Sequence, residues 1–280
     1  MCLHLFTKKI KALKANHPIG IFDSGIGGLT VAHAIAKVLP DESFVYFGDT
    51  AHLPYGDKST AAIQSYTVKI CDMLLKQDCK VILIACNSAS AAAYELAREY
   101  VGSKAKVISV IDPVVNYLET HYAHQTVGLI GTKKTVKSNV YHKKVDKLDC
   151  GIELKSLATP LLVPMIEEGF FDNSISENII HKYLSDPILQ NIQALILGCT
   201  HYPLIKKEIV DFYKGNVMVI DSSMIVANAV KQYLQEADLC TKNTVSKRTF
   251  WVSDYTKSFE ETTKIFFGKE VGLEYYPLWE

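Results

Sequence analysis

The chain has 280 residues, enough to bury a sizeable core in one large domain or two smaller ones. Lysine plus arginine and aspartate plus glutamate balance at 30 each, so no basic field favours a nucleic acid or an anionic membrane surface. With 48% hydrophobic and 21% charged residues, the composition is that of an ordinary soluble globular protein, and no apolar run is long enough to span a bilayer.

The cysteine content and the first residues bear on the compartment. Seven cysteines, with no CxxC pair, argue against a disulfide framework and against a structural zinc site. Free thiols fit a reducing cytosol, so we expect a cytoplasmic protein. The segment 1–18 carries lysines after a short apolar start, which is the wrong order for a secretory signal. We interpret it as an N-terminal extension.

Short apolar runs rich in Ile, Val and Leu alternate with longer segments of helical spacing along the whole chain. This alternation predicts an α/β architecture with buried parallel strands. The expected strands are 19–23, 44–47, 81–85, 107–111, 127–130, 194–197 and 217–220. The expected helices include 58–77, 88–101 and 203–213, and Ser59 is the expected cap of the first of these.

The first expected strand runs into a glycine-rich turn. A dinucleotide-binding fingerprint would need a glycine at Thr30, and a Walker loop would need a final G-K-[ST], so neither phosphate motif fits. We expect a tight turn whose backbone N–H groups line a pocket and suit a carboxylate. Asp23, just before the glycines, has two interpretations: a cap for the next helix, or a carboxylate facing the pocket.

Two segments share one pattern, an apolar strand that runs straight into a cysteine and then into small polar residues. They are VILIACNSAS (81–90), with Cys86, and ALILGCTHYP (194–203), with Cys199. Ligands of open α/β sheets bind at the carboxyl ends of the strands, so these thiols are expected to face one pocket from opposite sides. The alternative, a cysteine acting as a small buried hydrophobe, fits the remaining cysteines better.

Three further positions have both a structural and a functional interpretation. His201 lies two residues after Cys199, where it can relay a proton or lower the pKa of the thiol. Pro54-Tyr55-Gly56 is either a simple turn or a wall of the pocket with an aromatic ring, a phenol and a backbone N–H. Glu167 and Glu168 end an apolar helical stretch, and without other information a solvated helix turn explains them.

A weak internal duplication suggests two domains. GIFDSGIGGLTV (20–31) and GLIGTKKTV (128–136) both read as strand, small-residue turn and helix start, and each is followed by one cysteine-bearing strand. We expect two pseudo-symmetric parallel-sheet α/β domains facing each other across a central cleft. The first comprises 19–112 plus 222–280 and the second 113–221, with linkers near Asp112-Pro113 and Asp221-Ser222. A single long sheet is the alternative.

Six segments occur in an order and spacing that resemble the glutamate racemase family, within the aspartate/glutamate racemase superfamily. They are FDSGIGGLTV, the Pro54-Tyr55-Gly56 turn, ACNSAS, VPMIEEG, LGCTHYP and WVSDYTKSFEE. The match covers nearly everything from about Ile19 to Gly268; Ser88 departs from the threonine usual in the family but keeps the hydroxyl. The resemblance implies a cofactor-independent enzyme that makes D-glutamate for peptidoglycan, with the substrate between two pseudo-symmetric α/β domains.

Carried over position by position, the resemblance also implies the site. Cys86 and Cys199 would be the two acid/base catalysts, with Asp23 assisting the first and Glu167 and His201 the second. No metal or cofactor is implied. The substrate-binding residues implied by the family motifs are Asp23, Ser24, Tyr55, Gly56, Asn87, Ser88, Thr200 and His201.

Racemisation removes the α-proton from one face of an amino acid and delivers a proton to the other face. Two opposed thiols suit this reaction because they titrate close to physiological pH. The competing interpretations are an aspartate racemase or related two-thiol isomerase, a cysteine hydrolase or thiol oxidoreductase, and a module that only binds glutamate. A small molecule is the expected partner, and the oligomeric state, including a homodimer, stays open.

Overall fold

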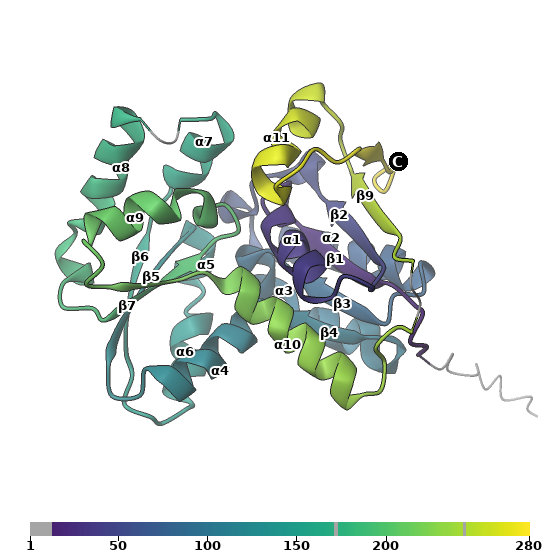
Figure 1. The fold of residues 1–280 in the computed structure, drawn as a ribbon, viewed down its shortest axis with the longest axis horizontal. Coiled ribbons are helices and arrows are strands. Elements are labelled where there is room, and N and C mark those ends of the chain that lie inside the picture. Colours follow the sequence, from purple (N-terminus) through teal and green to yellow (C-terminus); the bar gives the residue numbers. More distant parts are fainter. Residues whose placement is uncertain (1–12, 171–172, 243–244) are drawn as a thin grey trace, which may run out of the picture.

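The computed structural model describes residues 13–170, 173–242 and 245–280. The first twelve residues of the expected N-terminal extension lie outside this part of the chain. The described strands form two sheets, and every strand pair in them is parallel. The sheets lie in two lobes with helices around them (Figure 1). The predicted class, α/β with two parallel sheets, is confirmed, and the single long sheet is excluded.

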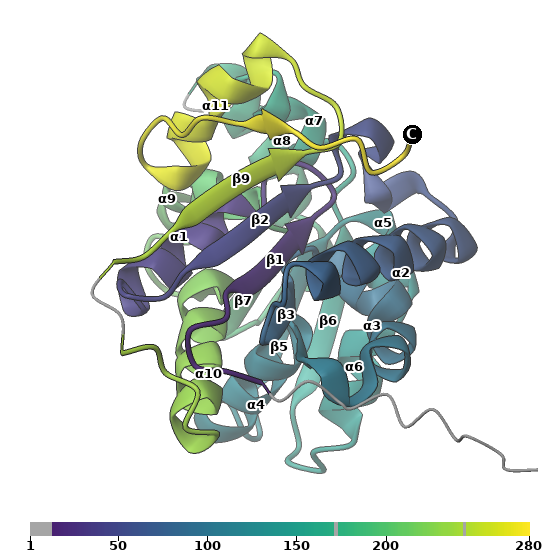
Figure 2. The ribbon, with the colours of Figure 1, turned by 90° about the vertical axis from the view of Figure 1, so that its right-hand side faces the viewer.

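The larger sheet has the strand order β10-β9-β2-β1-β3-β4, and Figure 2 shows β9, β2 and β1 side by side. Its central strands are entirely buried apolar runs, as expected for a sheet covered by helices on both faces. The strands are β1 (Ile19–Asp23), β2 (Phe44–Gly48), β3 (Val81–Ile84), β4 (Lys106–Ser109), β9 (Arg248–Val252) and β10 (Glu274–Tyr275). Its helices are α1 (Leu29–Val38), α2 (Thr60–Lys76), α3 (Asn87–Val101), α10 (Ser222–Glu236) and α11 (Lys257–Phe267).

The smaller sheet has the order β6-β5-β7-β8. Its strands are β5 (Thr126–Gly131), β6 (Glu153–Ala158), β7 (Ala194–Gly198) and β8 (Met218–Ile220). Its helices are α4 (Ile111–His121), α5 (Lys133–Lys137), α6 (Val140–Asp146), α7 (Leu162–Glu167), α8 (Ser174–Leu184) and α9 (Lys206–Phe212). Among the described residues, no helix of either lobe is both long and apolar enough to cross a membrane.

The two sheets repeat one topology. The order β2-β1-β3-β4 in the larger sheet corresponds to β6-β5-β7-β8 in the smaller one, so β3 and β7 occupy equivalent positions. Cys86 follows β3 and Cys199 follows β7. The turn after β1 likewise corresponds to the turn after β5, which is the duplication that the sequence suggests.

Helices α4 and α10 connect the two sheets along the chain and pack against each other. Asp112 and Pro113, expected in a linker, are in the first turn of α4, and Ser222 begins α10 with Asp221 as its cap. Helix α10 packs against both α1 and α4 (Figure 1). The chain therefore passes from one sheet to the other through helices. The domain boundaries themselves stay a prediction.

Most predicted elements are present, and the differences are local. Ser59 accepts a hydrogen bond from the backbone N–H of Ala62, which confirms it as the cap of α2. The strand expected at 107–111 ends at Ser109, because Ile111 already begins α4. The sequence analysis did not predict β6, β9 or β10.

Candidate active site

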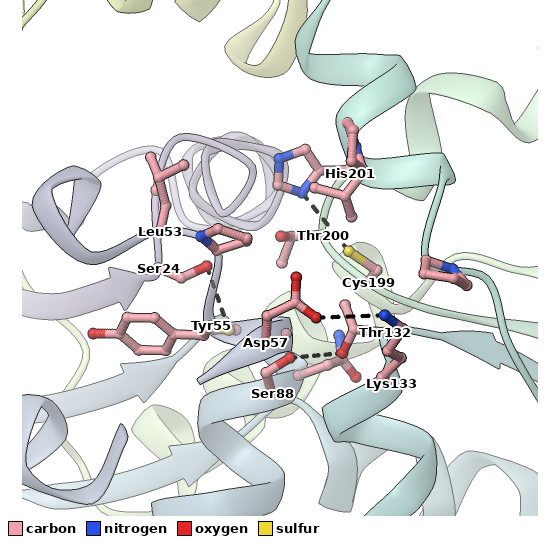
Figure 3. A pocket seen from close by; sticks show the side chains of 18 of the residues that line it. Ser24, Leu53, Tyr55, Asp57, Ser88, Thr132, Lys133, Cys199, Thr200 and His201 are labelled. Atoms are coloured by element: carbon pink, nitrogen blue, oxygen red, sulfur yellow. Dashed lines mark hydrogen bonds and ion pairs between the residues drawn. The ribbon is translucent and has the colours of Figure 1, made fainter. Parts of the chain in front are cut away.

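One cavity lies where the carboxyl ends of the central strands of both sheets meet (Figure 3). Its walls come from the segments after β1, β2, β3, β5, β6 and β7 and from α7. It contains both cysteines that the sequence analysis singles out, Cys86 and Cys199. Among the described residues, no group of three or more His, Cys, Asp or Glu side chains is arranged to hold a metal ion.

Cys86 caps helix α3. Its Sγ accepts a hydrogen bond from the backbone N–H of Ala89 at 3.4 Å, and its S–H donates to Oγ of Ser24 at 3.7 Å. The side chain is buried, and burial, together with the nearby carboxylate of Asp23, raises the pKa of the thiol to about 12. At neutral pH this cysteine therefore carries its proton.

Asp23 ends β1 and is completely buried. Its carboxylate accepts hydrogen bonds from the backbone N–H of Gly25 at 3.1 Å and from Oγ1 of Thr200 at 3.4 Å. Burial raises the pKa of this carboxyl group, and the positive charge of His201 opposes that rise. Helix α1 begins at Leu29 with Gly28 at its cap position, so the interpretation of Asp23 as the helix cap is wrong.

Cys199, His201 and Glu167 form a series of hydrogen-bonded side chains, with Cys199 at one end. Its Sγ is 3.7 Å from Nδ1 of His201, and Nε2 of the same ring is 3.0 Å from Oε1 of Glu167. Burial by itself favours neutral imidazole, but the hydrogen bonds to Cys199 and Glu167 outweigh it and raise the pKa of His201 to about 10. Glu168 lies exposed beyond the end of α7, so Glu167 is the carboxylate that reaches the site.

The two cysteines therefore have different surroundings. Beside Cys86 stands a buried carboxyl group, which disfavours a second negative charge. Beside Cys199 stands the imidazole of His201, whose pKa is raised to about 10, so the ring is protonated at neutral pH. One thiol thus lies beside a buried acidic side chain and the other beside a cationic ring.

The residues after Cys86 place polar groups at the amino end of α3. The amide oxygen of Asn87 accepts a hydrogen bond from the Tyr141 hydroxyl at 2.9 Å, while its amide nitrogen is buried and has no partner among the described residues. Oγ of Ser88 is 2.8 Å from Oγ1 of Thr132, which joins the two lobes. An unpaired buried N–H at a cavity wall, next to a helix amino terminus, is suited to an anionic ligand.

Tyr55 and Gly56 form the wall contributed by the segment after β2. Figure 3 shows the Tyr55 hydroxyl directed away from Cys199 and Thr132. That hydroxyl donates to Oδ2 of Asp49 at 2.6 Å. The cavity is therefore lined by the backbone and the ring of this segment, whereas the phenolic O–H is used elsewhere.

All the residues expected at the site lie at this cavity. Asp23 lies immediately behind its lining, where it contacts Thr200. The other expected residues line the cavity: Ser24, Tyr55, Gly56, Cys86, Asn87, Ser88, Glu167, Cys199, Thr200 and His201. It also includes residues that the sequence analysis missed. Thr132 and Lys133 follow β5, and Nζ of Lys133 is 3.9 Å from Oδ1 of Asp57 across the cavity (Figure 3). Both residues belong to the duplicated segment GLIGTKKTV, so the sequence pattern could have placed them at the cavity.

The chain resembles proteins of known function over nearly its whole length. Residues 29–230 match the family model for Asp/Glu/Hydantoin racemase. The chain is 36% identical over 260 residues to a glutamate racemase of Syntrophus aciditrophicus, covering 92% of this chain and 96% of that protein. It is 37% identical over 253 residues to one of Neisseria meningitidis serogroup A, with coverages of 90% and 93%.

Solved structures of glutamate racemases also resemble this chain. The glutamate racemase of Francisella tularensis, in complex with D-glutamate, superposes with a TM-score of 0.89 at 39% identity, covering 95% of this chain and 99% of that one. The glutamate racemase of Thermus thermophilus, in complex with β-chloro-D-alanine, gives 0.84 at 34% identity, with coverages of 94% and 98%. The chain therefore belongs to the Asp/Glu/Hydantoin racemase family, and its similarity within that family is to the glutamate racemases.

Proposed function

We propose that this chain interconverts L- and D-glutamate by a two-base transfer of the α-proton, without a cofactor. One observation carries the proposal: two cysteines at equivalent strand ends of two sheets line the same cavity. The relative from Francisella tularensis was solved with D-glutamate, and this chain matches it over 95% of its length. A hydrolase or a thiol oxidoreductase has no need of two thiols in separate sheets with opposite electrostatic surroundings.

The direction in which each cysteine acts is what the resemblance to the glutamate racemases implies: Cys199 removes the α-proton of L-glutamate and Cys86 that of D-glutamate. Starting from L-glutamate, the anionic sulfur of Cys199 takes the α-proton, and the thiol of Cys86 donates its proton to the opposite face. The result is D-glutamate, with Cys199 protonated and Cys86 anionic. The reverse reaction uses the same two groups in exchanged roles. Asp23 assists at Cys86, and His201, held by Glu167, assists at Cys199.

The α-proton of an amino acid is weakly acidic, so the site must stabilise negative charge that develops on the α-carbon and its carboxylate. The amino end of α3 and the unpaired amide N–H of Asn87 are preorganised donors for that carboxylate. The hydroxyls of Ser24, Ser88 and Thr200 supply further hydrogen bonds to the substrate. The remaining proposed substrate-binding residues are Asp23, Tyr55, Gly56 and His201.

The biological setting is part of the same proposal. D-glutamate is made for peptidoglycan, and the reaction takes place in the cytoplasm, where catalytic thiols stay reduced. The first domain comprises 19–112 plus 222–280 and the second 113–221, with the substrate between them. The oligomeric state, including a homodimer, is left to measurement.

The test is to incubate the pure protein with L- or D-glutamate, with no cofactor added, and to follow circular dichroism to equilibrium. We expect the signal to decay to zero from either enantiomer. Aspartate, tested in parallel, should react far more slowly; faster turnover of aspartate would instead identify an aspartate racemase. Tight binding of glutamate without any decay would mean that the chain only binds it.

A further inference from the structure

Asp49 is a buried carboxylate outside the cavity that accepts four side-chain hydrogen bonds. The residue follows β2 and is 0% exposed. Oδ2 accepts from the Tyr55 hydroxyl at 2.6 Å, and Oδ1 accepts from Oγ of Ser253 at 2.8 Å and from Nε1 of Trp279 at 2.8 Å. Nδ1 of His52 lies 3.0 Å from Oδ2. A carboxylate offers about four acceptor positions, so Asp49 is fully used.

The four donors come from three separate parts of the chain. His52 and Tyr55 belong to the segment that forms one cavity wall, Ser253 follows β9, and Trp279 follows β10. Trp279 also packs edge-on against His52, with ring centroids 4.5 Å apart, and against Tyr66 of α2 at 5.4 Å. Ser253 in addition accepts the backbone N–H of Ala51 at 3.0 Å. The wall segment is thus joined to two distant segments through one carboxylate.

The hydrogen bond between Tyr55 and Asp49 also determines what Tyr55 can do at the cavity. A phenol has one proton, and this proton is donated to Asp49. Burial and the adjacent Asp49 raise the pKa of Tyr55 well above its usual value, so the hydroxyl keeps its proton and stays a donor. Tyr55 therefore has no O–H to offer a substrate carboxylate, and its hydroxyl serves to hold the wall segment.

We propose that Asp49 is a positioning residue for substrate binding, and that Trp279 is part of the same anchor although it does not line the cavity. The four hydrogen bonds hold residues 53–57, and with them the ring of Tyr55 and the backbone of Gly56, against the substrate. This inference rests on the proposed function for its kinetic consequence. The anchor itself is a property of the folded chain and is testable without a substrate.

The kinetic test compares Tyr55→Phe and Trp279→Phe, each of which removes one hydrogen-bond donor and keeps an aromatic ring, with Asp49→Asn. That change removes the charge and replaces one of the two acceptor oxygens by an NH2 group, which cannot accept. We expect KM for glutamate to rise about tenfold in each single-donor variant, corresponding to about 1.4 kcal/mol, with kcat changed less than KM. The double variant Tyr55→Phe with Asp49→Asn should bind no more weakly than Asp49→Asn alone, because the two residues act as one unit.

Two other pairs in the chain provide matched controls. Tyr100 donates to Asp72 at 2.9 Å, and Trp251 donates to Glu274 at 3.1 Å, both away from the cavity. Tyr100→Phe and Trp251→Phe remove the same chemical groups and should leave KM unchanged. Unchanged KM in both Tyr55→Phe and Trp279→Phe, or an equal rise in the controls, would overturn the proposal.

Hydrogen exchange measured by mass spectrometry separates this proposal from the proposed function. Backbone amides in a peptide covering 50–58 should exchange faster in Tyr55→Phe, Asp49→Asn and Trp279→Phe than in wild type and in Trp251→Phe. If the wild type does not racemise glutamate, the proposed function fails, while faster exchange still supports the anchor. Unchanged exchange in all three variants refutes the anchor, whatever the wild type does with glutamate.

Discussion

Gly27 and His201 pack so closely that a β-carbon on the glycine would lie 2.4 Å from Cε1 of the imidazole. The glycine precedes α1 in the larger lobe, and the histidine follows β7 in the smaller lobe. The neighbouring Gly28 makes room in the same way for Asp23, whose Cβ would be 2.5 Å from an added β-carbon. Gly27 thus permits the close approach of the two lobes at the site, whereas Gly28 makes room for a side chain of its own lobe.

Gly27→Ala should therefore displace His201 and impair catalysis while leaving the fold intact. A displacement of about 1 Å at a catalytic group typically costs about 100-fold in rate, so we expect kcat to fall by about that factor. Steady-state kinetics with L-glutamate measure this, and thermal unfolding checks the fold. Gly272→Ala is the control, since an added β-carbon there meets no atom within 4 Å. Normal kcat in Gly27→Ala would show that the contact has no role.

Two neighbouring glutamates, Glu167 and Glu168, allow a test of whether the contact between Glu167 and His201 contributes to catalysis. Glu167→Gln replaces a carboxylate by a neutral amide at the 3.0 Å contact with Nε2, so protonated His201 loses a charged partner. A hydrogen bond to a charged group contributes about 1.5–3 kcal/mol, so kcat should fall about 10- to 100-fold. Glu168→Gln changes an exposed side chain and should leave kcat unchanged. The opposite order of effects would assign the role to Glu168.

The fold could be predicted where strands are buried on both faces. β1, β2, β3 and β7 are continuous apolar runs because helices cover both sides of them. β6, at the edge of its sheet, buries only Leu154 fully, and its mixed sequence gives no such signal. The end of β4 was misplaced because Val110 and Ile111 are apolar and buried but belong to the start of α4.

The site could be predicted where its residues adjoin a strand end in sequence. Cys86 and Cys199 carry that signal, and so do Asp23 and His201. The partners of Asp49 carry none, because Ser253 and Trp279 reach it only through the tertiary fold. The role of Gly27 also cannot be predicted from the sequence, because the atoms that leave no room for a side chain belong to the other lobe.

Alkylation by iodoacetamide should distinguish the two thiols that line the cavity, because only thiolates react quickly. A thiol with a pKa of about 12, as at Cys86, is almost wholly protonated at pH 7, and its thiolate fraction rises about tenfold for each pH unit below that pKa. Cys199, beside protonated His201, should react first at pH 7, and His201→Asn should slow its reaction. Labelling is located by peptide mass spectrometry.

Cys71 is the matched control for this experiment, since burial also raises its pKa to about 12 but it lies outside the cavity. D-glutamate should protect Cys199 from alkylation and leave the slow reaction of Cys71 unchanged. Labelling of Cys86 ahead of Cys199 at pH 7 would contradict the raised pKa of Cys86 and the proposed effect of His201 on its neighbour.

Lys80 and Glu42 form a fully buried ion pair at 2.6 Å, at the opposite end of the larger sheet from the site. Nζ of Lys80 also donates to the backbone oxygens of Ala15 and Leu239. Removing one partner of a buried pair leaves an uncompensated charge, so Lys80→Met should lower the free energy of unfolding by about 3–5 kcal/mol. Chemical denaturation measures this. Lys76→Met, which breaks an exposed pair with Asp72, should leave stability nearly unchanged.

The decisive prediction concerns the two cysteines in deuterium oxide. If one sulfur removes the α-proton and the other delivers its own, early D-glutamate formed from L-glutamate should carry deuterium at the α-carbon, and so should early product of the reverse reaction. Cys86→Ala and Cys199→Ala should each abolish racemisation, because either loss leaves one face of the substrate without its proton partner.

Each single variant should nevertheless exchange the α-proton of one of the two enantiomers. Cys86→Ala retains Cys199 and should exchange the α-proton of L-glutamate only, whereas Cys199→Ala should exchange that of D-glutamate only. Cys150→Ala, outside the cavity, should racemise normally. Proton NMR of the α-position follows the exchange, and circular dichroism follows inversion. Retention of the original α-hydrogen in early product, or normal racemisation by Cys86→Ala or Cys199→Ala, would be incompatible with two bases. Exchange of both enantiomers by one variant would mean that a single group reaches both faces of the α-carbon.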